Sequence, residues 1–243
     1  MLNGKGTFVE SPQRKVFKGV TVNVIGRNGG VFPSAIEATT IQYIDTDLRD
    51  GSTLIFRKEA EPLNVKDTTS NAANHWGQRE NVVKYKRASN EDRLLEVAFR
   101  VDDILEIYIS TQDCYTVRVR TRWGSFPVVG KHERIVEKAA YCRPFAVFQK
   151  KSDKQVTILT AVPIDNIVKI DTSFADGTTL VKTCEPKIVP VVESVDDVVA
   201  IIDKSVASFE AAQIEMRKKL KEEKKLGPER LRLALERSEE ACS

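Results

Sequence analysis

Few residues in this sequence have the type and spacing that catalysis or metal binding requires. The two histidines, His75 and His132, are far apart, and neither has an obvious partner. The sequence has no HExxH pair, no Cys/His cluster and no P-loop spacing. We therefore interpret both histidines as ordinary surface or boundary residues. We expect no catalytic residue, no metal site and no cofactor.

The acidic residues and the glycine run allow two interpretations each. Asp45, Asp47 and Asp50 form a cluster that could bind a cation or act as paired carboxylates. Carboxylates beside a turn more often accept hydrogen bonds from its backbone amides, and we favour that interpretation. The run Gly26–Gly30 could hold a phosphate, but it lacks the following Lys-Ser/Thr and helix, so we expect a plain turn.

The clearest interaction signal is a group of cations next to aromatic residues in the middle of the chain. Alternation predicts that Val117 and Val119 point inward from a strand while the arginines between and after them share the other face. Cations beside an aromatic ring suit a surface that follows phosphates and stacks bases. The alternative is a solvated face balanced by Glu106 and Asp113. The candidate nucleic-acid-binding residues are Lys84, Lys86, Arg87, Arg118, Arg120, Arg122 and Trp123, with Tyr85 among them.

The overall composition predicts a folded protein with a well-charged surface. The charged fraction is 30%, and the net charge of +3 is too small to indicate nucleic-acid binding by itself. No apolar run approaches 18 residues and no secretory signal follows Met1, so we expect neither a membrane span nor export. The four scattered cysteines indicate reduced thiols in a cytoplasmic protein.

The elements that must position these residues are repeated along the chain. Residues 41–59 and 167–185 share nine of nineteen positions without a gap, at an offset of 126. A middle copy begins at half that offset, where Ile104, Ile107, Asp113 and Thr116 occupy the matching positions. A constant offset of 63 without insertions indicates two duplications of one unit and a shared fold in all three copies.

Each unit has the pattern of short strands followed by a short helix. Val20, Val22 and Val24 alternate with polar residues, as in a half-buried strand. Asp50-Gly51 and Asp176-Gly177 lie between apolar runs and predict hairpin turns, and Asn28-Gly29-Gly30 predicts another. The stretches that can form the short helices are 68–76, 131–139 and 194–202. We expect a mainly β protein with α (α+β), in which three small units form barrel-like or curled sheets, each closed by a short helix.

The third unit resembles the small FlbD-like family of bacterial flagellar proteins. The resemblance lies in Asp165–Ile170, Asp176–Leu180 and Val191–Val199, and it covers about residues 163–203. It implies the shape of the unit, a hairpin followed by a capped helix, and we do not extend it to motility. The three copies and the long C-terminal segment depart from that family.

After Ser194 the apolar period changes to that of a coiled coil. Ser194 is a natural N-cap, and Asp196 and Asp197 suit the positive end of a helix. The apolar spacing of four and three residues predicts either self-association or packing against the chain's own units. Gly227-Pro228 predicts the end of this helix. The expected oligomerisation residues are Val199, Ile202, Val206, Phe209, Met216 and Leu220, with Gln213 as the polar exception.

We divide the chain into an N-terminal arm (1–11), three β-units (12–76, 77–139 and 140–203), a long helix (194–226) and a short terminal helix or tail (229–243). The favoured hypothesis is a non-enzymatic assembly or adaptor protein that associates with itself or with another protein through the long helix. By analogy, repeated β-units without a site suit a phage or viral structural component, in the host cytoplasm or the virion. The alternative is a nucleic-acid-binding protein.

Overall fold

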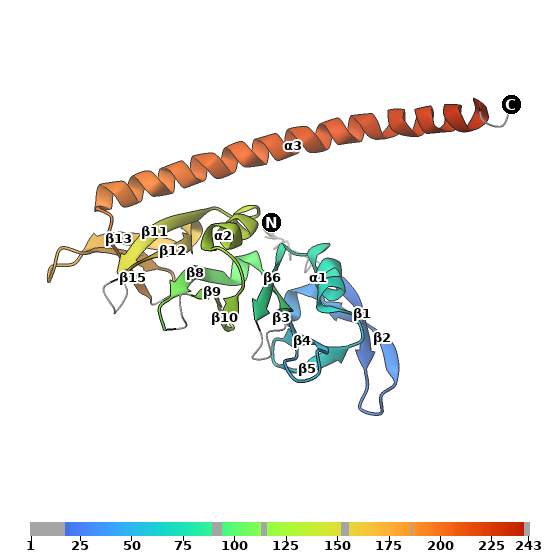
Figure 1. Cartoon of the computed structure of the whole chain (residues 1–243), viewed down its shortest axis with the longest axis horizontal. Coiled ribbons are helices and arrows are strands. Elements are labelled where there is room, and N and C mark those ends of the chain that lie inside the picture. The colour runs from blue at the N-terminus through green and yellow to red at the C-terminus, as the bar shows by residue number, and fades with distance from the viewer. Residues whose placement is uncertain (1–17, 89–93, 113–115, 152–155, 186, 241–243) are drawn as a thin grey trace, which may run out of the picture.

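The chain forms a mainly β body with a very long C-terminal helix, as the computed structural model shows (Figure 1). The structure describes residues 18–88, 94–112, 116–151, 156–185 and 187–240, with side chains as far as 222. The predicted N-terminal arm lies outside these residues. Within them the mainly β character with helices is confirmed.

The same order of elements occurs three times, each time as two strands, a 3-10 turn (η), three strands and a helix. The first series is β1 (Gly19–Ile25), β2 (Val31–Glu37), η1 (Ala38–Thr40), β3 (Ile41–Thr46), β4 (Thr53–Arg57), β5 (Ala60–Val65) and α1 (Thr69–Gly77). The second is β6 (Val82–Ala88), β7 (Leu94–Arg100), η2 (Val101–Asp103), β8 (Ile104–Ser110), β9 (Thr116–Thr121), β10 (Gly124–Val128) and α2 (His132–Ala140). The third is β11 (Phe145–Lys151), β12 (Thr157–Pro163), η3 (Ile164–Asn166), β13 (Ile167–Thr172), β14 (Thr179–Thr183), β15 (Ile188–Val191) and α3 (Val195–Glu240).

The strands form open antiparallel sheets, so the expectation of barrel-like units is wrong. The orders are β2-β1-β5-β4-β3-β7-β6, β10-β9-β8-β12-β11 and β13-β14-β15. The first hairpin of the second series, β6–β7, pairs with β3 of the first series, and β11–β12 pairs with β8 in the same way. In the first two series the edge strand pairs with the next hairpin along the chain instead of closing the unit on itself.

Backbone hydrogen bonds recur at the same 63-residue spacing. The amide of Lys66 donates to the carbonyl of Asn23 at 2.8 Å, that of Val129 to Lys86 at 2.7 Å, and that of Val192 to Gln149 at 2.8 Å. Each bond joins the residue after the last strand of a series to the first strand of that series. The three series therefore share local geometry as well as element order.

The local patterns that predicted strands and turns are confirmed. Val20 and Val22 are buried while Thr21 and Asn23 are exposed, as alternation along β1 requires. Gly51 lies at a φ of 75° in the β3–β4 turn, a conformation that glycine adopts without strain. Gly177 in the β13–β14 turn and Gly29 in the β1–β2 turn have similar positive φ angles.

Three apolar clusters form the core, and two of them cross from one series into the next. The first includes Trp76 of α1 and also Ala98 of β7. The second includes Ile135 of α2 and also Ala161 of β12. The third includes Phe148 and Val198 and draws only on the third series. The hairpins β6–β7 and β11–β12 thus complete the cores that precede them.

The C-terminal helix is longer than the sequence predicts. Ser194 caps it as expected, because its Oγ accepts a hydrogen bond from the amide of Asp197 at 3.2 Å. The predicted end at Gly227-Pro228 is wrong, since α3 runs without interruption to Glu240, and 229–240 is not a separate helix. Proline removes one backbone donor, but strong helix formers on both sides allow the helix to continue. Figure 1 shows α3 running along one side of the body and projecting past it.

Candidate functional site

Arg87 and Asp45, from β6 and β3, form a pair across the join between the first two series. The Arg87 guanidinium donates to the Asp45 carboxylate at 2.9 Å and to the carbonyl of Thr46 at 3.0 Å. Burial raises the pKa of Asp45 to about 6, although the neighbouring guanidinium opposes that shift. Arg87 is therefore committed to the protein itself rather than to an external phosphate.

The arginines of β9 follow the predicted alternation only in part. Val117 and Val119 are buried, as expected, and Arg118 and Arg120 share the opposite face of β9. Arg118 donates through Nε to the Ser125 hydroxyl at 3.1 Å. Arg122 lies beyond the end of β9, in the turn before β10, so the prediction that it continues the row is wrong. The strand ends at Thr121 because that residue pairs with Gly124 across a tight turn.

The remaining members of the predicted nucleic-acid surface differ in exposure. The Lys84 ammonium donates to Asn74 Oδ1 at 2.8 Å and to the Ser70 hydroxyl at 3.0 Å, both on α1. Lys86 and Arg122 are exposed, and Trp123 is 37% exposed. Of the seven predicted residues, these three are exposed, and the other four are half-buried.

Glu106, which the alternative interpretation placed beside the arginine row, is the centre of a buried charge cluster, whereas Asp113 lies outside the described residues. The Glu106 side chain is buried, and it accepts hydrogen bonds from Arg120 Nε at 3.1 Å and from the Thr160 hydroxyl at 3.0 Å. Lys187, from the third series, completes the cluster with an ion pair to the same carboxylate. Burial alone would raise the pKa of Glu106, but Lys187 and then Arg120 hold it below its ordinary value. Sequence reasoning expected a solvated face and missed its burial: Glu106 lies opposite Arg120, on the face of β8 that points away from Ile107 and the core.

A second buried cation, Arg143, also joins two series. Its Nη1 donates to the carbonyls of Val101, Asp102 and Ile104 at 3.2 to 3.3 Å, around η2. Its Nε lies 2.7 Å from the Asp165 carboxylate in η3. The guanidinium satisfies backbone acceptors that burial would otherwise leave unpaired, so its role is structural.

The acidic turns fit the structural interpretation, but the prediction of a surface or boundary position is wrong for His132, which is buried. Asp50 Oδ1 accepts the Ser52 amide at 2.8 Å, and this bond lowers the pKa of the carboxyl. Asp47 accepts the Arg49 amide at 2.8 Å. His75 is exposed, whereas His132 is buried with Nε2 3.0 Å from the Ile107 carbonyl, and burial lowers its pKa. No group of three metal-ligating side chains occurs among the described residues.

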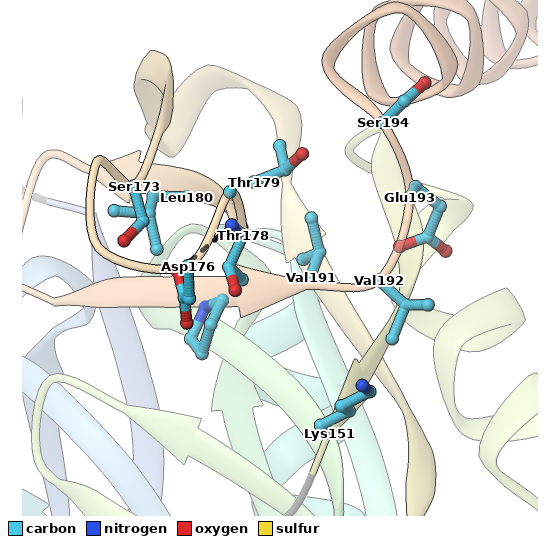
Figure 2. Close-up of a pocket in the computed structure, with 12 residues that line it drawn as sticks. Lys151, Ser173, Asp176, Thr178, Thr179, Leu180, Val191, Val192, Glu193 and Ser194 are labelled. Carbon is cyan, nitrogen blue, oxygen red and sulfur yellow. Dashed lines mark hydrogen bonds between the residues drawn. The ribbon is translucent and has the colours of Figure 1, made fainter.

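A hollow of about 770 Å³ lies beside the β13–β14 turn (Figure 2). Lys151, the strand β15 and the residues before α3 form its other side. Its polar groups serve the backbone: Asp176 Oδ1 accepts the Thr178 amide at 3.1 Å, and Glu193 Oε1 accepts the Gln149 amide at 2.7 Å. This arrangement stabilises turns and presents no nucleophile with an adjacent base.

The predicted seam of α3 remains incompletely covered. Val199 is 43% exposed and Leu220 is 50% exposed, and the seam residues between them are half-buried. The Gln213 amide donates to the carbonyl of Tyr141 at 3.0 Å, so this polar member of the seam faces the body. None of the described helices is long and apolar enough to cross a membrane.

Comparisons with known proteins leave the family of this chain open. No protein-family model matches the chain, and no curated protein matches it. Among solved structures, the chain is similar to the LytTr DNA-binding domain of a methyl-accepting/DNA response regulator from Bacillus cereus. The two share 14% identity at a TM-score of 0.33, over 49% of this chain and 95% of that one. At that score the similarity carries no argument about the fold or function of this chain.

Proposed function

We propose that this chain is a non-enzymatic assembly or adaptor protein. Three homologous β-units form its rigid body, and α3 associates with a second copy or with another protein. We place it in the cytoplasm, or in the host cytoplasm or virion if it is a phage or viral component. The recurring element order and the 63-residue spacing of backbone hydrogen bonds support the three homologous units.

The observation that carries the proposal is the incompletely covered seam on a helix of 46 residues. Gln213 of the seam bonds to the Tyr141 carbonyl of the body, yet Phe209 and Met216 beside it are only half-buried, so the body covers this part of the seam incompletely. Pairing two such seams would remove Val206, Phe209, Met216 and their neighbours from water. A helix that served only to close the third unit could end near residue 203, as α1 and α2 end.

The test compares two exposed apolar residues of α3 that differ in their place on the helix. Leu220, on the seam, is 50% exposed, and Ile214, off the seam, is 54% exposed. Leu220→Glu should lower the molar mass measured by light scattering, whereas Ile214→Glu should leave it unchanged. Equal masses for wild type and both variants would contradict association through this seam.

Nucleic-acid binding remains the alternative, and one feature favours it. Arg122 and Trp123 are adjacent and exposed in the β9–β10 turn, where a cation beside a ring could contact phosphate and base. A gel shift across a salt series, with Arg122→Glu and Trp123→Ala, tests it. Binding that responds neither to salt nor to these changes would rule it out.

A further inference from the structure

Two strand pairings join the three series, and they have the same register. Between β3 and β7, Ile44 lies opposite Ala98. Between β8 and β12, Ile107 lies opposite Ala161. Each partner is displaced by 63 residues from its counterpart, so the two joins are copies of one interface.

The third series has the strand for such a join but lacks the incoming hairpin. No described strand pairs with the outer side of β13, which is the counterpart of β3 and β8. The amide of Ser173 donates to the carbonyl of Thr178 at 2.8 Å. In an antiparallel ladder Thr172, and Ile170 two residues before it, therefore direct their N–H and C=O groups away from β14, toward the open side.

The core of the third series is unfinished on the same side. Ile44 and Ile107 are fully buried, but their counterpart Ile170 is only half-buried. Ala73 of α1 and Val136 of α2 are 2% and 7% exposed, whereas their counterpart Val199 of α3 is 43% exposed. In the first two cores, Ala98 and Ala161 of the incoming hairpins cover the corresponding residues. In the described part of the chain, the third core has no such residue.

The other end of the chain has the complementary feature. No described strand pairs with the outer side of β2, the counterpart of β7 and β12. Ala35 on β2 is exposed, although its counterparts Ala98 and Ala161 are 0% exposed. The hairpin β1–β2 thus resembles the hairpins that complete the cores before them, but it has no core to complete in its own chain. Figure 1 places β2 and β13 at opposite ends of the body.

We infer that β2 of one copy pairs with the outer side of β13 of a second copy, head to tail, with Ala35 opposite Ile170. Ala35 then packs beside Val199 in the third core, as Ala98 packs with α1 in the first. Gly19, the counterpart of Val82, adds no side chain, so Ala35 carries the apolar contact. Pro33 lies beyond the pairing, because the β3–β7 ladder ends at the counterparts of Ala35 and Ser34.

The side chains beside the proposed β2–β13 pair leave a hollow that a residue of the second copy would fill. A hollow of about 670 Å³ lies along β13 between Lys169 and Lys182. Their counterparts in the first series, Tyr43 and Phe56, stack on each other, and Phe126 of the next series packs against Tyr43 at 5.1 Å. Leu63 lies 63 residues before Phe126 and is its counterpart in the first series. At the proposed join, Leu63 of the second copy would occupy this hollow.

The charged pair of the second join recurs with its signs exchanged. Glu106 pairs with Lys187 across that join. Their counterparts at the proposed join are Lys169 on one copy and Glu61 on the other. Lys169 lies 2.7 Å from Asp171 of its own chain, but its side chain is still 63% exposed, and Glu61 is exposed. Opposite charges therefore meet again. A contact of this kind uses different surfaces on the two partners, so it continues into a ring or a filament.

This inference rests on the proposed assembly role and adds a second interface to it, so the test separates β-edge association from association through α3. Ala35→Lys places a charge where the third core needs an alanine, and it costs the free chain nothing because Ala35 is exposed. Ile170→Pro removes the outward N–H of β13 at the residue opposite Ala35, without removing a β13–β14 hydrogen bond. Ala211→Lys, at an exposed position of α3 away from the seam, is the matched control.

The measurement is sedimentation velocity on full-length chains, each made with and without Leu220→Glu, after thermal melts show native-like folding. Ala35→Lys alone and Ile170→Pro alone should each sediment more slowly than wild type. Ala211→Lys should sediment like wild type. An equimolar mixture of Ala35→Lys and Ile170→Pro should recover a pair and stop there, because one open β2 and one open β13 remain to meet. A mixture that forms no pair overturns the inference. If both variants associate like wild type while Leu220→Glu abolishes association, the inference is also overturned, but the α3 proposal stands. If wild type stays monomeric throughout, both are overturned.

Discussion

The guanidinium of Arg87 lies 2.9 Å from the carboxylate of Asp45, and this pair joins the first two series of elements. Asp45 is 8% exposed, and burial raises its pKa to about 6 in spite of the cation beside it. Desolvation therefore destabilises the ionised carboxylate by more free energy than the neighbouring guanidinium restores. The join therefore carries a group whose protonation is coupled to folding.

The pH dependence of unfolding should report this group. A folded pKa of about 6, above the ordinary value of 3.8, means that the folded chain holds the proton more tightly. The resulting stabilisation is complete below about pH 4 and is lost as pH rises through about 6. Relative to Asp45→Asn, wild type should lose up to about 3 kcal/mol of unfolding free energy over that range. Urea titrations at several pH values measure it. Asp203→Asn, at an exposed site on α3, should keep the wild-type profile, and an identical profile for Asp45→Asn would contradict the account.

Removing the Glu106 carboxylate should destabilise the second join. Glu106→Ala leaves Lys187 and Arg120 beside each other without their shared partner, which should cost about 3 kcal/mol. Because the residues act together, adding Lys187→Met should cost less than the sum of the two single changes. Chemical denaturation measures the coupling. The exposed pair Lys219–Glu215 on α3 is the control, where Lys219→Ala should stay within about 0.5 kcal/mol of wild type. Strictly additive costs at Glu106 and Lys187 would show that the cluster does not act as a unit.

Arg120 and Arg122 should separate a structural role from a binding role. Arg120 is held by Glu106 and lies 3.5 Å from Glu185, whereas Arg122 is exposed. Arg120→Ala should lower the melting temperature by several degrees, and Arg122→Ala should leave it unchanged. Differential scanning calorimetry decides this. A loss of nucleic-acid affinity in Arg122→Ala without a change in melting would favour the alternative function.

Two glycines should respond in opposite ways to alanine. Gly51 has a φ of 75° and open space around its Cα, so Gly51→Ala should cost about 1 kcal/mol through backbone strain alone. Gly77 ends α1 with an ordinary φ, and an added Cβ would meet Val82 at 3.8 Å, a normal contact. Gly77→Ala should therefore be neutral or stabilising by a few tenths of a kcal/mol. Thermal unfolding of both variants tests the assigned turn geometry, and equal effects would contradict it.

The sequence predicted what local patterns determine. Alternation identified β1 and β9, the Asp-Gly pairs identified two turns, and Ser194 identified the start of α3. It did not predict that β7 pairs with β3 or that β12 pairs with β8, because nothing in a strand's own pattern names its neighbour across a join. The barrel-like units were wrong for this reason.

The candidate surface was predictable only where side chains stay in solvent. Arg87 and Arg120 have the composition of a nucleic-acid face, but their carboxylate partners lie 42 and 14 residues away in the chain. Lys187 reaches Glu106 over 81 residues. The sequence analysis named Glu106 as a charge that could balance the arginines, but the pairs Arg87–Asp45 and Lys187–Glu106 become visible only when the fold brings the elements together. The predicted helix end at Gly227-Pro228 was wrong because the helix formers on both sides outweigh the one hydrogen bond that proline removes.

The most direct test of the assembly role is the molar mass of the full-length chain, measured by light scattering over a wide concentration range. One chain has a mass of 27.3 kDa. The account predicts a mass above that value that rises with concentration and falls in Leu220→Glu but not in Ile214→Glu. A constant 27.3 kDa at every concentration, unaffected by either change, would contradict it.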